Sequence, residues 1–227
     1  QNKGLINKFE IDLKKWVPPK ADLEKIGIHE VTPYPYLKRA NKLYNLGLYD
    51  QAKLEIKEAI KIMPDSAFSY KLLGKIYRKK RLYNKAFENY RIASLFNPAD
   101  SEIRRDLGIM YSALGDFEKA EKEMRLAVRI DAQDADNYYI LALLLESQNR
   151  DEEAIELLNK AVKLKPFIPD YLFELGKIFA KEKDYKTALN LFQRALEIKS
   201  GSASLRNNLA IALFKNSKPN EAEKQFK

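Results

Sequence analysis

The chain has 227 residues, of which 45% are apolar and 32% charged, and its formal net charge is +9. It contains no cysteine and a single histidine, His29, so disulfides, zinc–thiolate sites, thiol nucleophiles and paired-histidine sites are excluded. The longest apolar run, 138–145, is far shorter than the about 18 residues that a membrane-spanning helix needs. With only eight Gly and nine Pro, the composition favours a packed, mostly helical protein with a large charged surface.

Residues 1–32 form an N-terminal segment that lies outside the regular pattern of the rest of the chain. Apolar residues, including the only tryptophan, Trp16, are spaced as one face of a short helix, and Pro18-Pro19 must end it. A second short helical stretch covers 21–28. We expect this segment to be a helical cap on the first repeat, because solenoids need covered ends. The alternative, that it docks elsewhere or folds back into the groove of the repeats, stays open.

From Pro33 onwards the sequence repeats with a period of 34 residues. The units are 33–66, 67–100, 101–134, 135–168 and 169–202, followed by a shortened sixth, 203–227. The twentieth position of every unit is alanine: Ala52, Ala86, Ala120, Ala154, Ala188 and Ala222. Two helices that cross closely leave room only for a small side chain, so this position predicts a helix–helix crossing in each unit.

Small and large residues alternate at other fixed positions of the repeat. The eighth position is small, with Ala40, Gly74, Gly108, Ala142, Gly176 and Ala210. The twenty-fourth is large, with Ile56, Tyr90, Met124, Leu158, Phe192 and Phe226. The eleventh is also large, with Leu43, Tyr77, Tyr111, Leu145, Phe179 and Leu213. We interpret these stripes as core and not as a ligand site.

The second unit shows the repeat motif most fully. Its spacing places Tyr70, Leu73, Gly74, Tyr77, Ala86, Tyr90, Ala93 and Pro98 as in W-x2-L-G-x2-Y…A-x3-F…P. Residues 33–227 therefore resemble the tetratricopeptide repeat family. The resemblance implies an all-α, right-handed superhelical solenoid of helix–turn–helix repeats, five complete and a truncated sixth. It also implies that the first helix of each repeat lines a concave groove.

No constellation of residues points to catalysis. Paired carboxylates such as Glu152-Glu153 and Glu121/Glu123 lie among Lys and Arg, which is typical of a solvated helix face with i,i+4 pairs. There is no glycine-rich phosphate loop and no nucleophile with a histidine partner. We expect no enzymatic activity, no cofactor and no metal.

The resemblance implies that the groove is lined by positions 2, 5, 9, 12 and 13 of each repeat. The partner-binding residues that we select from these positions are Tyr34, Leu37, Asn41, Tyr44, Phe68, Lys71, Lys75, Arg78, Lys79, Arg105, Tyr139, Leu143, Phe173 and Lys177. Along position 5 the line changes from cationic residues to the aromatic Tyr139 and Phe173. Exposed aromatic side chains often mark interaction surfaces.

The positive charge concentrates in the second repeat, whose net charge is +6, whereas the third and fourth repeats are −2 each. Such a patch predicts capture of an acidic or carboxylate-bearing peptide. Solubilising charge, nucleic acid and an anionic membrane are the alternatives. The acidic third and fourth repeats argue against nucleic acid, because they would repel a phosphate backbone that follows the groove.

One peptide-binding pattern of the family is missing. The carboxylate clamp for chaperone C-terminal tails needs Lys at position 5 and Asn at position 9 of its first repeat, and here Asn41 accompanies Leu37. Leu72, Glu102 and Asp106 occupy the later clamp positions. A chaperone tail is therefore not the predicted ligand.

The sequence thus predicts a non-catalytic scaffold that binds a protein or peptide partner in its groove. The alternatives are nucleic-acid or anionic-surface binding through the second repeat, or a targeting domain of a larger enzyme. Since the chain begins at Gln1 and stops inside a repeat, we expect it to be part of a longer protein. Its compartment stays open between the cytoplasm and, with an upstream signal or anchor, the periplasm or a membrane. We expect apolar Ile211, Leu213 and Phe214 to be exposed at the unfinished end, where two chains could pair.

Overall fold

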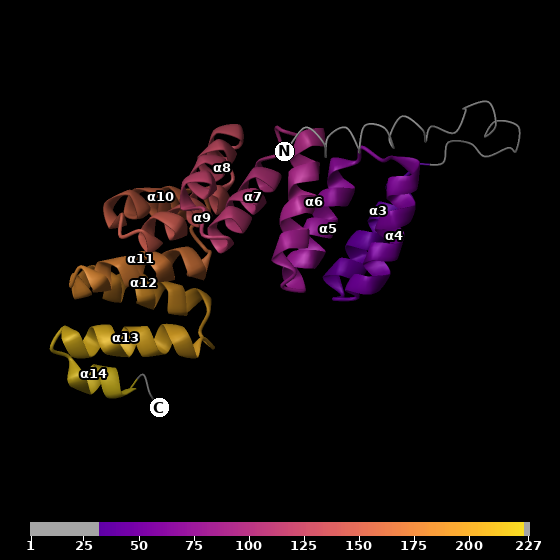
Figure 1. Ribbon diagram of the computed structural model, residues 1–227. Coiled ribbons are helices and arrows are strands. Elements are labelled where there is room, and N and C mark those ends of the chain that lie inside the picture. The colour runs from indigo at the N-terminus through magenta and orange to yellow at the C-terminus, as the bar shows by residue number, and fades with distance from the viewer. Residues whose placement is uncertain (1–31, 225–227) are drawn as a thin grey trace, which may run out of the picture. The chain divides into compact units, whose positions relative to one another are not determined.

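The computed structural model describes residues 32–224 (Figure 1). Within them the regular elements are twelve helices in six consecutive pairs, one pair for each predicted repeat. The predicted all-α helix–turn–helix repeat fold is confirmed. The predicted N-terminal cap lies outside the described residues, as does Phe226, so both stay predictions.

The chain divides into two compact units, Gln1–Pro98 and Ala99–Lys227. The helices of the first are α3 (Tyr34–Asn45), α4 (Tyr49–Ile62), α5 (Ala67–Lys79) and α6 (Tyr83–Phe96). Those of the second are α7 (Ser101–Ala113), α8 (Phe117–Ile130), α9 (Ala135–Ser147), α10 (Asp151–Leu164), α11 (Pro169–Lys181), α12 (Tyr185–Ile198), α13 (Ala203–Lys215) and α14 (Pro219–Lys224). Odd-numbered helices are the first helices of the repeats and even-numbered helices are the second.

The last residue of one repeat begins the first helix of the next. The side chains of Ser66, Asp100, Asp134 and Ser202 each accept a hydrogen bond from a backbone N–H in the first turn that follows. Such caps satisfy donors that have no partner inside the helix. Ile168 cannot do this, and there the helix starts instead with Pro169, whose fixed φ suits the first helical position.

The turn inside each repeat uses a left-handed residue at position 15. The residues and their φ angles are Gly47 (75°), Arg81 (58°), Gly115 (82°), Asn149 (60°), Lys183 (68°) and Ser217 (59°). Only two of them are glycine, the residue that adopts this conformation without a steric cost. The repeat therefore enforces a left-handed backbone even where the local sequence disfavours it.

The alanines at position 20 are buried in all six repeats, which agrees with the predicted helix crossing. Position 8 is matched in size to position 24. A Cβ added to Gly74 would lie 2.7 Å from the Tyr90 ring, and one added to Gly176 would lie 2.6 Å from the Phe192 ring. In the first and fourth repeats, where position 8 is Ala40 or Ala142, position 24 is the aliphatic Ile56 or Leu158, and each pair lies in one core cluster. The two positions therefore fill one space between the helices of a repeat.

Part of the expectation for the last repeat is wrong. Leu213 is buried, because it packs in a core cluster with Phe192 and with Ala222 of α14. Ile211 and Phe214 are exposed, as expected. The short second helix is sufficient to cover the side of α13 that carries Leu213.

Candidate functional site

The first helices α3 and α5 form a pocket of about 360 Å³, which we call the α3–α5 pocket. Its lining residues are Tyr34, Leu37, Lys38, Asn41 and Phe68. The four residues on α3 are spaced by three, four and seven, so they share one helix face. Four of the five belong to the groove set proposed from the sequence. Lys38 was missed, although its i+4 relation to Tyr34 could have indicated it.

Aromatic surface is open to solvent around this pocket. The Tyr34 side chain is 68% exposed and that of Phe68 is 43% exposed. Lys71 places its Nζ 5.8 Å from the centre of the Phe68 ring, and Asn41 supplies an exposed amide. The pocket can therefore hold an apolar side chain and offer polar groups beside it.

Basic side chains continue along α5 from the pocket. Lys71, Lys75 and Arg78 are half-buried, and Lys79 is exposed. Their spacing of three, four and seven places them near one another on the helix. The following cation, Lys80, lies 2.7 Å from Asp50 of α4, and hydrogen bonds from Lys53 and Lys80 lower the pKa of Asp50 to about 2. One cation of this basic segment, Lys80, is thus paired with an acidic residue of the same unit.

Tyr44 lies away from the α3–α5 pocket. Its ring centre is 5.8 Å from that of Tyr49, and it packs against the core of the first unit. It is half-buried and holds the turn between α3 and α4.

In the second unit, Arg105 is engaged by the chain itself. Its Nη1 donates to Asp134 at 2.5 Å and to Asn137 at 2.8 Å. The Asn137 amide in turn donates to the backbone carbonyls of Ala127 and Asp131 at 3.2 Å each. Arg105 therefore joins α7 to the α8–α9 turn and to the start of α9.

The groove-position aromatics of the second unit are half-buried and paired with other rings. Tyr139 lies 4.9 Å from Tyr171, and Phe173 lies 5.9 Å from Phe192, between ring centres. Burial, together with the charges of Glu174, Asp170 and Asp136, raises the pKa of Tyr139 to about 12. These rings mainly pack successive helices together.

The remaining predicted residues of this unit show the same tendency. Leu143 is half-buried. Lys177 forms an ion pair with Glu174 at 2.5 Å, and its Nζ lies 5.8 Å from the Phe173 ring. The predicted site residues are thus brought together as a pocket in the first unit, whereas in the second they form contacts within the chain.

Residues 21–227 match the family described as the Cilia and flagella-associated protein 70 C-terminal domain. The chain belongs to this tetratricopeptide repeat family. The match covers more than half of the chain, and it starts inside the segment that we assigned to an N-terminal cap. The family prediction from the sequence is confirmed.

Solved structures of other tetratricopeptide repeat proteins share the fold. Pseudomonas aeruginosa PilF is 18% identical with a TM-score of 0.78, over 85% of this chain and 88% of its own. PilW, a type IV pilus biogenesis factor, is 18% identical with a TM-score of 0.76, over 87% and 93%. YrrB, described as having an unusual peptide-binding site, is 19% identical with a TM-score of 0.60, over 87% and 96%. No curated protein sequence matches the chain.

Between residues 32 and 224, no helix is long and apolar enough to cross a bilayer. In the same part of the chain, no three His, Asp or Glu side chains are grouped so that they could hold a metal ion.

Proposed function

We propose that this tetratricopeptide repeat domain is a non-catalytic scaffold whose α3–α5 pocket binds a segment of a protein partner. The observation that carries the proposal is the pocket itself, with Tyr34 and Phe68 exposed around about 360 Å³ of space. Burying exposed aromatic rings is a main source of binding free energy at protein interfaces. An apolar side chain of the partner would enter between the two rings.

The charge of α5 supports an acidic partner segment. Lys71, Lys75 and Lys79 recur every four residues along the helix that carries Phe68. Carboxylates that flank the apolar anchor would form charge-assisted hydrogen bonds with them. These charges would also accelerate association at low salt.

The proposal is tested by photo-crosslinking. A photoreactive phenylalanine at Tyr34 should crosslink a defined partner segment, and the same residue at the exposed Tyr83 of α6 should not. The crosslinked segment is then synthesised, and its affinity for the purified chain is measured. We expect Tyr34→Ser/Phe68→Ser to weaken binding more than about tenfold, since two aromatic anchors are lost.

The matched control is Tyr83→Ser/Phe117→Ser, which removes two rings of similar exposure from the second helices. It should change the affinity less than about twofold, since these rings are not at the pocket. Equal losses in both double variants would reject the α3–α5 pocket as the site. Binding that survives both but vanishes with nuclease treatment would support the nucleic-acid alternative instead.

A further inference from the structure

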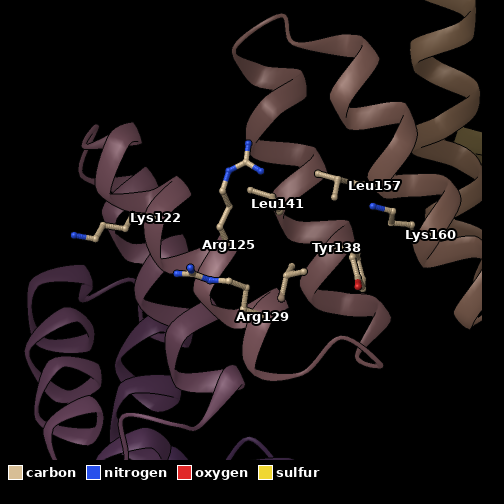
Figure 2. Close-up of a pocket in the computed structure, with 8 residues that line it drawn as sticks. Lys122, Arg125, Arg129, Tyr138, Leu141, Leu157 and Lys160 are labelled. Carbon is tan, nitrogen blue, oxygen red and sulfur yellow. The ribbon is translucent and has the colours of Figure 1, made fainter.

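The second unit contains a larger pocket on the face opposite to its groove positions. This α8–α10 pocket has a volume of about 450 Å³, and no sequence motif drew attention to it. Its lining residues are Lys122, Arg125, Val128 and Arg129 of α8, Tyr138 and Leu141 of α9, and Leu157 and Lys160 of α10. Figure 2 shows Lys122 and Arg129 on one side, Leu157, Lys160 and Tyr138 on the other, and Arg125 and Leu141 between them.

The cations of the pocket are aligned on one stripe of α8. Lys122, Arg125 and Arg129 are spaced by three and four residues, an arrangement of like charges that disfavours an isolated helix. Arg125 is held by Glu121 at 2.6 Å and by Glu153 at 3.2 Å. Among the described residues, no acidic side chain forms an ion pair with Arg129 or Lys160, and both are exposed. Arg129 and Lys160 therefore line the pocket without forming an ion pair to a carboxylate of the described residues.

The floor and one wall of the pocket are apolar, and the side chains that form them pack against one another. Leu141 is buried, and Leu157 and Val128 pack beside it as half-buried side chains. Tyr138 is oriented by a hydrogen bond from its hydroxyl to the Ala132 carbonyl at 3.2 Å, and the Lys160 Nζ lies 6.0 Å from its ring centre. The pocket can thus take an apolar group below and anionic groups at its rim.

The next groove along the same unit, between α10 and α12, differs at the equivalent positions. There Leu172, Leu175 and Leu191, which correspond to Tyr138, Leu141 and Leu157, are buried. Lys163 and Arg194 correspond by repeat position to Arg129 and Lys160, and Glu156 corresponds to Lys122. The aromatic ring of Tyr138 and the charge of Lys122 are therefore not repeated at the equivalent positions of the next groove.

We propose that the α8–α10 pocket is a second partner site, which binds an acidic peptide segment through one apolar side chain and its flanking carboxylates. The apolar group would rest on Leu141 and Leu157, and the carboxylates would pair with Arg129 and Lys160. A peptide fits better than a nucleic acid or a membrane, because Glu121 and Glu153 at the rim would repel an extended polyanion. A short segment needs charge complementarity only over the length of the pocket. This site does not depend on the α3–α5 pocket.

The test is a direct binding measurement on the full chain. The probe is a short fluorescent peptide with a central Leu flanked on both sides by Asp and Glu, followed by anisotropy at moderate salt. Two companion peptides replace the Leu by Ser or the acidic residues by Lys. A single-stranded DNA oligonucleotide and vesicles with phosphatidylserine represent the other anionic partners.

We expect Arg129→Glu/Lys160→Glu to weaken binding of the acidic Leu peptide at least about tenfold, since two attractive charges become repulsive. The matched control Lys163→Glu/Arg194→Glu makes the same change of net charge at the equivalent positions of the neighbouring groove. It should weaken binding less than about threefold, through long-range charge alone. All four side chains are exposed, and thermal unfolding checks that both variants keep the fold.

The other outcomes would overturn the proposal. Equal loss in the two double variants would mean that net charge, and not the pocket, attracts the peptide. Stronger binding of DNA or vesicles, or unchanged binding of the Ser peptide, would reject an apolar-anchored peptide site. No binding of the Leu peptide to the wild-type chain would reject the site itself. Loss of binding in Tyr34→Ser/Phe68→Ser alone would move the peptide to the α3–α5 pocket, so the two proposals fail separately.

Discussion

The first helices of the two units use the same repeat positions in different ways. In the first unit, position 5 is occupied by Leu37, which lines the α3–α5 pocket, and by Lys71, whose Nζ lies 5.8 Å from the centre of the Phe68 ring. In the second unit, Arg105 donates hydrogen bonds to Asp134 and Asn137, and the Tyr139 ring contacts the tilted Tyr171 ring. A position that the family uses for partners can therefore be used by the chain to join its own repeats.

The difference depends on what the following repeat places opposite position 5. Arg105 contacts Asn137 and Tyr139 contacts Tyr171, and both of these partners occupy position 3 of the next repeat. The charged Arg105 thus contacts a polar side chain, and the Tyr139 ring contacts another ring. The lesson is that a groove position has to be considered together with its neighbour one repeat later before it is assigned to binding.

The largest expected effect comes from breaking the Arg105 contacts in the second unit. Arg105→Met keeps the length of the side chain but removes the hydrogen bonds that Arg105 donates to Asp134 and Asn137. The side chains of Arg105 and Asp134 are only 15% and 21% exposed. We therefore expect a loss of about 2 kcal/mol in unfolding free energy, measured by urea denaturation. Lys119→Met, which breaks an exposed ion pair with Asp116, should lower the unfolding free energy much less, because solvent screens this pair. Similar losses in both variants would show that Arg105 does not join the repeats.

A smaller effect should follow from filling the space at position 8 in the first unit. Gly74→Ala places a Cβ against the Tyr90 ring, and overpacking of about 1–3 kcal/mol outweighs the gain of about 1 kcal/mol in helix propensity. We expect a net loss of about 1 kcal/mol in thermal or urea unfolding. In a Tyr90→Leu background, which copies the Ala142 and Leu158 pair, the same substitution should be neutral or stabilising. An unchanged loss in that background would contradict the size matching of the two positions.

The left-handed turn residues allow the two units to be compared at one repeat position. Lys183→Gly in the second unit should stabilise by up to about 1 kcal/mol, because glycine removes the steric cost of a positive φ. Gly47→Ala in the first unit should destabilise by about 1 kcal/mol, although nothing lies within 4 Å of the added Cβ. Both changes are measured by thermal unfolding. A loss of stability in Lys183→Gly together with a gain in Gly47→Ala would mean that the turns relax out of the left-handed region.

The smallest expected effect concerns Asp136, whose ionisation should make the unfolding free energy of the second unit depend on pH in acid. Burial opposes ionisation of this carboxyl, but hydrogen bonds from Tyr171 and Lys165 and the charges of Lys165 and Arg105 outweigh it and lower its pKa. A lowered pKa contributes stability that is present above the ordinary Asp value of about 3.9 and is lost as the pH falls through the folded value. Asp136→Asn should therefore flatten the decline of unfolding free energy below about pH 4.

The repeat fold could be predicted from the sequence, because it depends on size and periodicity. Six alanines at position 20 and the alternation of small and large residues at positions 8 and 24 specify where two helices must cross, and all described members are buried. The resemblance to the family also indicated Tyr34, Leu37, Asn41 and Phe68 as candidates, through the groove positions 2, 5 and 9 that it implies. The assignment of these residues to partner binding stays a prediction.

Only the tertiary structure decided which polar and aromatic residues are already used by the chain. The sequence offers Arg105 as a free groove cation, yet its partners Asp134 and Asn137 are about thirty residues away and meet it only when repeats stack. The left-handed φ of Arg81 and Lys183 is likewise imposed by the packed helix pair against local preference. The α8–α10 pocket is lined by Tyr138 and Leu157, whereas the equivalent Leu172 and Leu191 of the next groove are buried. Periodicity determines where helices lie, whereas contacts between side chains of different repeats determine which surface remains for a partner.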